Sequence, residues 1–533
     1  MQSSVSHHSS APPGKKSPFT RFLDTVEWLG NLLPHPVTLF ASLCLALFVA
    51  SGIAGYFELS VADPRPEGAA GRAADGIIAV NSLVNAEGVQ LIVTQMVKNF
   101  TGFAPLGTVL VAMMGVAVAE HSGLLSAVMR SLVLGASKRL VTMTIVFAAI
   151  VSNTASELGY VVLIPLAAMI FHSLGRHPLA GLAAAFAGVS GGYSANILLG
   201  TVDPLLSGIT QTAAQMIDPH YQVGPEANWY FMAASTLIVT LLGTLVTEKI
   251  VEPKLGPYNP EDASADFVPE EAQAVTELER KGMRNAGVAA LVVCAVLALT
   301  IVPEWGILRH PETGAVSGSP FLKGIVAMIV VFFAIPGFVY GKTVGTMKND
   351  RDVIDAMAKS IGSLGLYIVL VFFAAQFVAL FKWTNFGQVI AVSGADMLQS
   401  IGLTGPMLFF AFIVICGIIN LSLGSASAQW AVTAPIFVPM LMLVGYAPET
   451  IQAAYRIGDS VTNLITPMMS YFGLIMAVAT KYKRDLGIGT LIATMLPYTL
   501  VFLVGWSLFF FVWVFGLGFP VGPGSATYFE MLP

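Results

Sequence analysis

Charged residues are scarce in this chain. Lys and Arg number 26 and Asp and Glu number 31, so only 11% of the 533 residues are charged, against roughly a quarter in ordinary soluble proteins. This deficit excludes a soluble globular enzyme. The net charge of −5 offers no basic surface for nucleic acid, which excludes a polyanion as partner.

The chain also lacks the patterns that hold metals, disulfides or nucleotides. Cys44, Cys294 and Cys416 lie far apart, each within an apolar run, which indicates buried thiols rather than a disulfide framework or metal ligands. Neither a His-Glu-x-x-His motif nor a phosphate-binding Gly loop occurs, so neither a metalloprotease nor an ATP-driven pump is indicated. We expect no cofactor, with Na⁺ considered only as a coupling ion.

Long uncharged runs take the place of the missing charge. A bilayer core is crossed by about 20 helical residues, and 55% of the chain is hydrophobic. The run 397–448 exceeds one span and predicts a span together with a re-entrant hairpin. We therefore predict an all-α polytopic membrane protein with about eleven crossings, built on the runs 36–57, 99–119, 140–156, 179–202, 228–247, 285–303, 324–341, 360–381, 397–448, 460–480 and 486–529.

Lys and Arg concentrate in alternate loops. They precede the first span, follow the second, occupy the loop 249–284, follow Gly341 and precede the last span. The positive-inside rule places these loops in the cytoplasm. The N-terminal tail, which lacks the apolar core of a signal peptide, is therefore expected inside and the C-terminal tail outside.

Two parts of the chain repeat each other. The shift that places Ser152 on Ser422 also superposes several Gly, Pro, Ser and aromatic positions: Tyr160 on Trp430, Pro165 on Pro435, residues 175–178 (Gly-Arg-His-Pro) on 445–448 (Gly-Tyr-Ala-Pro), and Ser190 on Ser460. The first copy starts inside and exits outside, and the second does the reverse, so we expect antiparallel copies. Inverted repeats with interrupted helices are the architecture of alternating-access secondary transporters.

Each copy is predicted to contain a re-entrant hairpin and then a broken helix. The breaks are expected at 188–196 and 458–463, the second reaching Pro467. Gly and Pro there leave backbone groups that lipid cannot satisfy, so both stretches should line a cavity.

Four charged residues have apolar surroundings: Glu157, Asp203, Arg456 and Asp459. Ionisable groups inside a membrane are costly and mark functional sites by default. For Glu157 a structural interpretation stays open, because a hairpin tip can reach water.

Arg456 and Asp459 are three residues apart and so share one helix face. One interpretation is a pair that only neutralises itself. In the other, Arg456 holds a substrate carboxylate through its guanidinium fork, while Asp459 and Asp203 bind a coupling cation or proton.

Small polar side chains gather in the two hairpins. We expect Asn153 and Asn420, with Asp459, to form the Na⁺ or polar-ligand site, because a buried amide needs several partners. Trp430 can stack on an aromatic ligand or serve as an ordinary packing residue. The neighbouring hydroxyls, which also permit close helix packing, belong to Ser152, Thr154, Ser156, Ser422, Ser425 and Ser427.

Residues 188–192 match the Gly-x-Ser-x-Gly elbow of serine hydrolases, with Ser190 as nucleophile. A nucleophilic serine needs a base, and none of the eight His residues falls inside a later span. An intramembrane serine hydrolase is therefore kept only as the alternative from another functional class.

Three motifs resemble those of the aminobenzoyl-glutamate transporter (AbgT) family, most closely its neisserial-type antimetabolite efflux members. They are Ser-Asn-Thr-Ala-Ser-Glu-Leu-Gly-Tyr at 152–160, Gly-Ser-Ala-Ser-Ala-Gln-Trp at 424–430 and Ala-Ala-Tyr-Arg-Ile-Gly-Asp-Ser-Val-Thr-Asn at 453–463. The likeness runs from about Phe22 to the C-terminus.

The resemblance implies a homodimer in the bacterial inner membrane, with about nine spans plus two hairpins. It further implies a division into a cytoplasmic tail (1–35), frame spans (36–138, 228–248, 285–396 and 486–519), a cytoplasmic loop (249–284), transport repeats (139–216 and 397–480) and a periplasmic tail (520–533). The family's transport residues fall on Asp203, Asn420, Trp430, Pro448, Arg456 and Asp459.

These observations lead to one functional hypothesis. The chain moves p-aminobenzoyl-glutamate, related aromatic carboxylates or sulfonamides across a bilayer, driven by a proton or sodium gradient and by elevator-type motion of the repeats. A sodium–dicarboxylate symporter of similar architecture is the alternative within transport. Direction of transport does not follow from the residues.

Overall fold

Helices make up nearly all of the structure. The computed structural model describes residues 35–155, 159–264, 273–316, 318–466, 469 and 471–531. Within these ranges, eight helices are long and apolar enough to cross a membrane, and β1 (Ser60–Ala62) pairs with β2 (Ile77–Ala79) in a small antiparallel sheet. This confirms an all-α polytopic membrane protein. The tail 1–34 and Glu157 lie outside the described residues.

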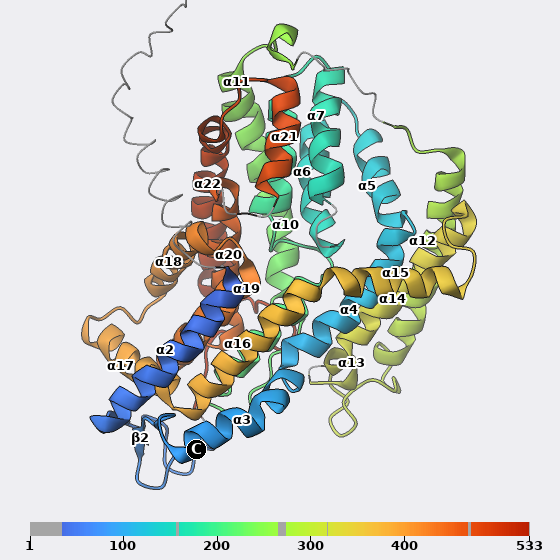
Figure 1. Ribbon diagram of the computed structural model, residues 1–533. Helices are drawn as coiled ribbons and strands as arrows, with labels where there is room; N and C mark the ends of the chain where they lie inside the picture. Colours follow the sequence, from blue (N-terminus) through green and yellow to red (C-terminus); the bar gives the residue numbers. More distant parts are fainter. Residues whose placement is uncertain are drawn as a thin grey trace, which may run out of the picture.

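The N-terminal helices are α2 (Pro36–Tyr56), α3 (Ala86–Thr101), α4 (Ala104–His121) and α5 (Leu124–Leu134). Pro36 suits the first turn of α2, where no N–H is needed. Asn85 caps α3 by accepting a hydrogen bond from the Gly88 N–H at 2.7 Å. Helix α16 (Gly365–Trp383) packs against both α2 and α3 (Figure 1).

The two repeats have matching boundaries. Under the shift that places Ser152 on Ser422, α8 and α20 begin at equivalent prolines, α9 and α21 begin at equivalent residues, and α7 and α19 end at equivalent residues. The first copy contains α6 (Val141–Ser152), a π-helical turn (Gly159–Leu163), α7 (Ile164–Ser173), α8 (Pro178–Phe186), a second π-helical turn (Ala187–Gly191) and α9 (Val202–Ala214). The second contains α18 (Met407–Leu423), α19 (Ala426–Leu443), α20 (Pro448–Thr462), a 3₁₀ turn (Asn463–Ile465) and α21 (Phe472–Tyr482).

Each hairpin is joined to the next helix by a corner that begins with glycine. Gly175 and Gly445 have φ angles of +70° and +105°, values that side-chain-bearing residues rarely adopt. Pro178 and Pro448 then start α8 and α20. The shared Gly-x-x-Pro motif therefore specifies the same chain reversal twice.

Contacts with α10 (Trp229–Val246) show that the repeats are inverted. The first corner is tied to its C-terminal side, because Arg176 Nε donates to Oε1 of Glu252 (2.8 Å), the first residue of α11 (Glu252–Leu255). The second corner is tied to its N-terminal end, because the Asn228 amide donates to the Glu449 carbonyl (2.8 Å). A helix of this length spans about 27 Å, so the corners lie at opposite sides of the molecule.

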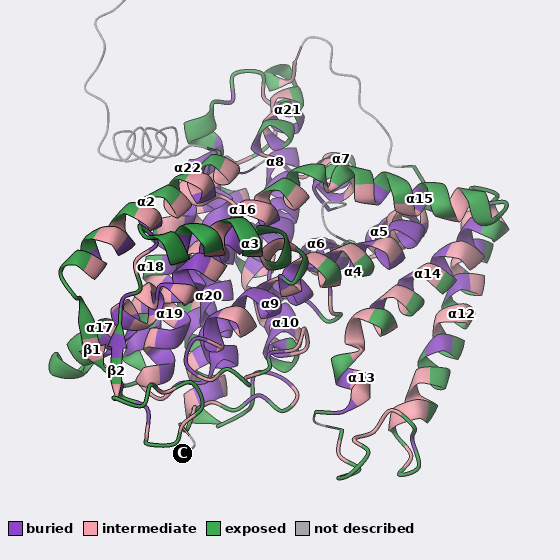
Figure 2. Ribbon diagram, turned by 60° about the horizontal axis from the view of Figure 1, so that its bottom comes forward, coloured by how far each residue is buried: buried purple, intermediate pink, exposed green. Residues whose placement is uncertain are grey.

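Helices α12 (Glu277–Ile301) and α14 (Ile325–Val344) stand together at one side of the molecule (Figures 1 and 2). Helix α14 crosses α4 closely: a Cβ on Gly115 would lie 2.4 Å from Val330 Cα, and one on Gly337 would lie 2.7 Å from Ala119 Cα. Small residues permit this approach in membranes. The connecting elements are α13 (Pro320–Lys323), α15 (Asp350–Ser363) and α17 (Phe386–Ser400), and the chain ends after α22 (Ile488–Phe511).

The repeats form the buried centre of the molecule. Every residue of α8 and α20 is buried, whereas α2, α3, α12 and α15 have largely exposed faces (Figure 2). Apolar helix surfaces that meet lipid require no protein cover, so exposure is expected on peripheral spans. The polar residues of the repeats are thus shielded from lipid by other helices.

Three of the predicted uncharged runs are not continuous spans. In 140–156 the α-helix ends at Ser152, in 179–202 the helix ends at Gly191, and in 460–480 the α-helix begins only at Phe472. The second break also starts later than expected at 458–463, because α20 continues through Asp459 to Thr462. Polar side chains of α18 and α20 hydrogen-bond to one another here and hold the helix together.

Candidate functional site at the junction of the repeats

A buried ion pair joins the two repeats. Arg456 on α20 and Asp203 in the first turn of α9 are 3% and 6% exposed, and Arg456 Nη2 lies 2.7 Å from Asp203 Oδ1. The second carboxylate oxygen of Asp203 accepts the Gly200 N–H at 2.7 Å. Asp203 is thus fixed by backbone and guanidinium together, in a geometry typical of strong charge-assisted contacts.

This contact differs from the Arg456–Asp459 pair that helical spacing favours. Asp459 is fully buried, yet neither of its carboxylate oxygens has a hydrogen-bond partner among the described residues. Arg456 Nε also lacks one there. The Arg456–Asp203 ion pair therefore leaves the Asp459 carboxylate and the Arg456 Nε–H able to bind a ligand where the two repeats meet.

Asn420 lies on α18, the first helix of hairpin 2 (α18 and α19), and connects this hairpin to the end of α20. Its amide N–H groups donate to the Asp459 carbonyl (2.7 Å), Thr462 Oγ1 (3.0 Å) and Asn463 Oδ1 (2.7 Å). Its own Oδ1 is buried without a partner in the described structure. Asn420 thus contacts the backbone of Asp459, and the Na⁺ site that would use both side chains stays a prediction.

Asn153, the third residue of that proposed site, follows α6 in the first hairpin. It is buried, and neither its Nδ2 nor its Oδ1 has a hydrogen-bond partner in the described part of the chain. No recorded contact joins it to Asn420 or Asp459. Buried amide atoms without partners are rare, which makes Asn153 a candidate ligand-binding residue separate from the other two.

The acceptors around Asn420 suit a small cation. Asn420 Oδ1 and both oxygens of Asp459 are buried without hydrogen-bond donors in the described structure, and Na⁺ is a hard ion that oxygen atoms coordinate. A proton on Asp459 would satisfy the same carboxylate. Within the described residues, no group of three or more His, Cys, Asp or Glu side chains could hold a metal ion.

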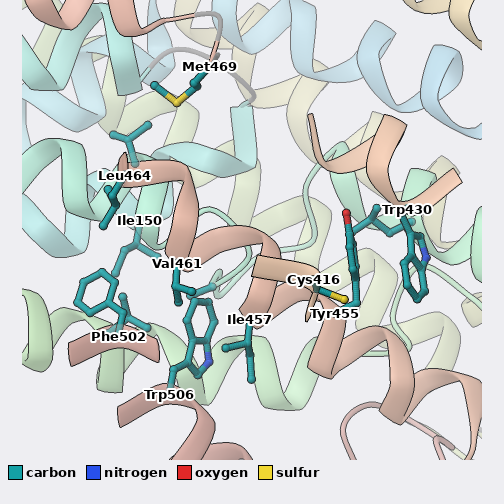
Figure 3. Close-up of a cluster of buried hydrophobic side chains, with 14 of the residues drawn as sticks. Ile150, Cys416, Trp430, Tyr455, Ile457, Val461, Leu464, Met469, Phe502 and Trp506 are labelled. Atoms are coloured by element: carbon teal, nitrogen blue, oxygen red, sulfur yellow. The ribbon is translucent and has the colours of Figure 1, made fainter. Parts of the chain in front are cut away.

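Trp430 on α19 is fully buried. Its indole stacks on Tyr455, with ring centroids 4.1 Å apart (Figure 3), and its Nε1–H donates to Thr210 Oγ1 at 2.8 Å. Thr210 in turn donates to Gln452, whose amide donates to Asn228. In the conformation shown, Trp430 therefore couples α19 to α9 and α20 through packing and hydrogen bonds.

Pro448 lies away from this junction, at the outer corner of the second repeat. The corner is held by an isolated β-bridge between Tyr446 and Tyr528 and by the hydrogen bond from the Ala447 N–H to the Thr527 carbonyl. Pro448 is thus the first residue of α20, and its part in substrate binding stays a prediction.

A cavity of about 620 Å³ opens where hairpin tips, breaks and frame helices meet. Tyr160 from the first hairpin and residues 424–427 from the second line it, with Tyr193, Thr201 and Asn463 from the breaks. Val202 and Leu205 also line it, so Asp203 and its partner lie behind this wall of α9. This volume is within the roughly 300–1,000 Å³ typical of small-molecule sites.

Sequence reasoning missed several residues of this cavity. Tyr160 and Tyr471 stack with centroids 4.6 Å apart, and Glu120, His121 and Lys359 contribute ionisable side chains from α4 and α15. The internal repeat, which aligns Tyr160 with the aromatic Trp430, was a sequence signal that could have identified Tyr160. No sequence signal pointed to Glu120, His121 and Lys359, because they lie on helices outside the repeats.

Ser190 is fully buried, and its Oγ lies 3.1 Å from the sulfur of Met469. Within the described residues no His contacts it, so the base that a nucleophilic serine requires is missing from its surroundings.

Comparison with known proteins agrees with this architecture. Residues 21–529 match the AbgT putative transporter family. The p-aminobenzoyl-glutamate transport protein of Escherichia coli strain K12 is 39% identical over 517 residues, covering 97% of this chain and 98% of that protein.

Two solved structures are also similar. Neisseria gonorrhoeae MtrF, described as one of a class of antimetabolite efflux pumps, is 64% identical with a TM-score of 0.88, covering 95% of this chain and 100% of that one. The Alcanivorax borkumensis YdaH transporter, described as having an unusual topology, is 45% identical with a TM-score of 0.84, covering 92% and 100%.

These likenesses extend over nearly the whole chain. The chain is a multi-pass membrane transporter and not an enzyme, which excludes the serine-hydrolase alternative. It belongs to the AbgT transporter family.

Proposed function

We propose that this protein is a secondary active transporter of p-aminobenzoyl-glutamate and related aromatic carboxylates or sulfonamide antimetabolites, coupled to a proton or sodium gradient. The observation that carries the proposal is the buried Arg456–Asp203 ion pair, adjacent to an Asp459 carboxylate without a recorded hydrogen-bond partner, behind the wall of a cavity lined by both hairpins. The relatives named for p-aminobenzoyl-glutamate transport and antimetabolite efflux support the substrate class.

The ion pair provides a mechanism for coupling. A substrate carboxylate that reaches Arg456 competes with Asp203 for the same guanidinium fork. Once released, Asp203 is a buried carboxylate without its counter-charge, and it takes up a proton or cation because a lone buried charge is costly. Substrate binding and ion binding are thereby linked at one residue pair.

The fold supports alternating access by elevator-type motion. The tips of both hairpins face helices α4, α15 and α16 across the cavity, so movement of the repeats along these helices would carry the junction across the membrane. We assign the frame to 36–138, 228–248, 285–396 and 486–519, and the moving repeats to 139–216 and 397–480.

We place the protein in the bacterial inner membrane as a homodimer, with its N-terminus in the cytoplasm and its C-terminus in the periplasm. The positive loops support this orientation. The tyrosines of the cavity, Tyr160, Tyr193, Tyr367 and Tyr471, favour an aromatic acid over an aliphatic dicarboxylate.

Flux in proteoliposomes tests the proposal. We expect radiolabelled p-aminobenzoyl-glutamate or a sulfonamide to move under an imposed H⁺ or Na⁺ gradient, with succinate as the comparison substrate. Arg456→Ala should weaken binding of carboxylates far more than that of neutral analogues. Equal loss for both would assign Arg456 a structural role, and flux of succinate alone would support the dicarboxylate symporter.

Asp459→Asn tests the coupling group. The variant should fold normally, because asparagine keeps the size of the side chain and an oxygen that faces the neighbouring Tyr455, while gradient-driven flux should disappear. Asp396→Asn on the exposed face of α17 is the matched control and should transport normally. Normal ion-dependent flux in Asp459→Asn would remove this residue from the mechanism.

A further inference from the structure

A second cavity, of about 570 Å³, lies apart from the junction of the repeats. It is open on one side and is bordered by α3, the C-terminal ends of α9 and α16, the start of α17 and the loop that follows β1. Its walls contain the side chains of Gln95, Asn99, Gln215, Lys382, Trp383 and Gln388. Neither the ion pair nor the hairpin tips contribute to it.

The two cavities lie at opposite ends of the same helices. Thr201 and Leu205 near the start of α9 line the first cavity, and Gln215 at its end lines the second. Likewise, Tyr367 and Trp383 mark the two ends of α16, which crosses the molecule diagonally in Figure 1. A helix of this length separates its ends by about 20 Å or more.

Helix α3 faces the second cavity with a polar stripe. Leu91, Gln95 and Asn99 line it at intervals of four residues, so they share one helix face. The other sides of α3 are exposed and rich in valine, as at Val89, Val93 and Val97. Carboxamides on a membrane helix that turn inward rather than toward lipid indicate a polar ligand or pathway.

Three carboxamides around the cavity are anchored through their amide nitrogens, each of which donates one hydrogen bond to a backbone carbonyl: Gln215 to Tyr221, Asn385 to Ala79 and Gln388 to Met216. One N–H and the oxygen atom of each carboxamide remain for a ligand, and the oxygen is a hydrogen-bond acceptor. Such acceptors suit the N–H groups of an aromatic amine or an amide.

One cation of the cavity is available to an anion. Arg65 is neutralised by Asp63, with Nη2 and Oδ2 2.6 Å apart. Lys382, by contrast, has no recorded ion pair or side-chain hydrogen bond within the described residues, and it is followed by Trp383, whose ring also lines the cavity. A Lys-Trp pair at a helix end is a common interfacial anchor, but that role does not require a polar cavity with inward-facing carboxamides.

We propose that this cavity is a second binding site, for an aromatic amine that carries a carboxylate. Lys382 binds the carboxylate, the ring lies against Trp383, and the carboxamide oxygens accept hydrogen bonds from the amine. The site holds the substrate at the outer end of α9 before or after its passage through the junction of the repeats. This inference depends on the proposed function only for the choice of ligand.

Equilibrium binding to the full-length protein in lipid nanodiscs tests the site. With radiolabelled p-aminobenzoate or p-aminobenzoyl-glutamate we expect two sites per chain. Lys382→Met should weaken one of them at least tenfold and leave the other unchanged, because it removes the charge but keeps the apolar stem. The neutral analogue p-aminobenzamide should bind the outer site of Lys382→Met and of the wild-type protein equally, because it has no carboxylate for Lys382.

Lys98→Met is the matched control, since Lys98 lies on α3 beside Asn99 but is exposed and outside the cavity. It should retain both sites. A single site per chain in the wild-type protein, or equal affinities of Lys382→Met and wild type, would overturn the proposal. Displacement of the bound ligand by phosphatidylglycerol, dependent on Lys382, would also overturn it by assigning the cavity to a lipid headgroup.

The two proposals fail in different ways. Retention of both sites at wild-type affinity in Arg456→Ala would contradict substrate binding at the junction of the repeats. The outer site is judged by its response to Lys382→Met alone, whatever the outcome at Arg456.

Discussion

The Arg456–Asp203 ion pair is buried where a charge without a partner would be costly. Each member comes from a different repeat, so the contact links the two halves of the inverted structure. A buried pair adds little net stability, whereas removing one partner leaves an uncompensated charge. The pair is therefore suited to change partners during transport rather than to stabilise the fold.

A double-mutant cycle tests this role. Asp203→Asn and Arg456→Met should each destabilise the protein by about 3–5 kcal/mol, and the double variant should be more stable than either one, because no buried charge remains. All three should lose coupled flux. Thermal unfolding in detergent measures the effect, and additive losses in the double variant would show that the two residues do not interact energetically.

The stability of the first corner should depend on pH, because a histidine caps the helix that begins there. At the first corner the His177 Nδ1 accepts the Leu179 N–H at 3.2 Å, which requires a ring with Nδ1 unprotonated. Burial, and then the positive charge of Lys483, lower the pKa of His177 below 6.5, while Asp262 and Glu252 oppose the shift. The neutral imidazole is thus part of the folded corner.

Acidification should therefore weaken this corner. Because the folded-state pKa of His177 is lower than the unfolded value of 6.5, its contribution to stability is fully present above pH 6.5 and declines as the pH falls through the folded-state pKa. Melting temperatures between pH 7.5 and 5 should fall less in His177→Gln than in the wild-type protein. His220→Gln in the exposed outer loop is the control, and identical pH profiles for His177→Gln and wild type would contradict the assignment.

The starts of α8 and α20 could be predicted from the sequence because Gly-x-x-Pro determines a chain reversal within four residues. The ion-pair partner of Arg456 could not be predicted from the sequence. Helical spacing makes Asp459 a neighbour, but whether the guanidinium turns toward Asp203 depends on how α9 packs against α20, a contact between distant parts of the chain. Asn420 was predictable as a buried amide, whereas its three hydrogen-bond acceptors, two on α20 and one in the 3₁₀ turn that follows, were not.

At the scale of the whole molecule, the two cavities occupy opposite ends of α9 and α16. The junction cavity lies near the end of α15 that leads into α16. Lys342 at the end of α14, Lys348 in the following loop and Arg351 at the start of α15 predict that this side faces the cytoplasm. We therefore expect this conformation to be a cytoplasm-facing state, in which the lengths of α9 and α16 separate the second cavity from the junction.

Alternating access predicts that residues of the junction cavity change sides. In a variant without Cys44, Cys294 and Cys416, Ser425→Cys at the tip of hairpin 2 should react with a membrane-impermeant thiol reagent from the cytoplasmic face, and from the periplasmic face only when substrate and a gradient are supplied. Lys138→Cys and Lys323→Cys serve as inner and outer reference positions and should each react from one face under all conditions. Reaction of Ser425→Cys from the cytoplasmic face alone, while flux proceeds, would show that the repeats do not carry this residue across the membrane and would exclude the elevator-type motion.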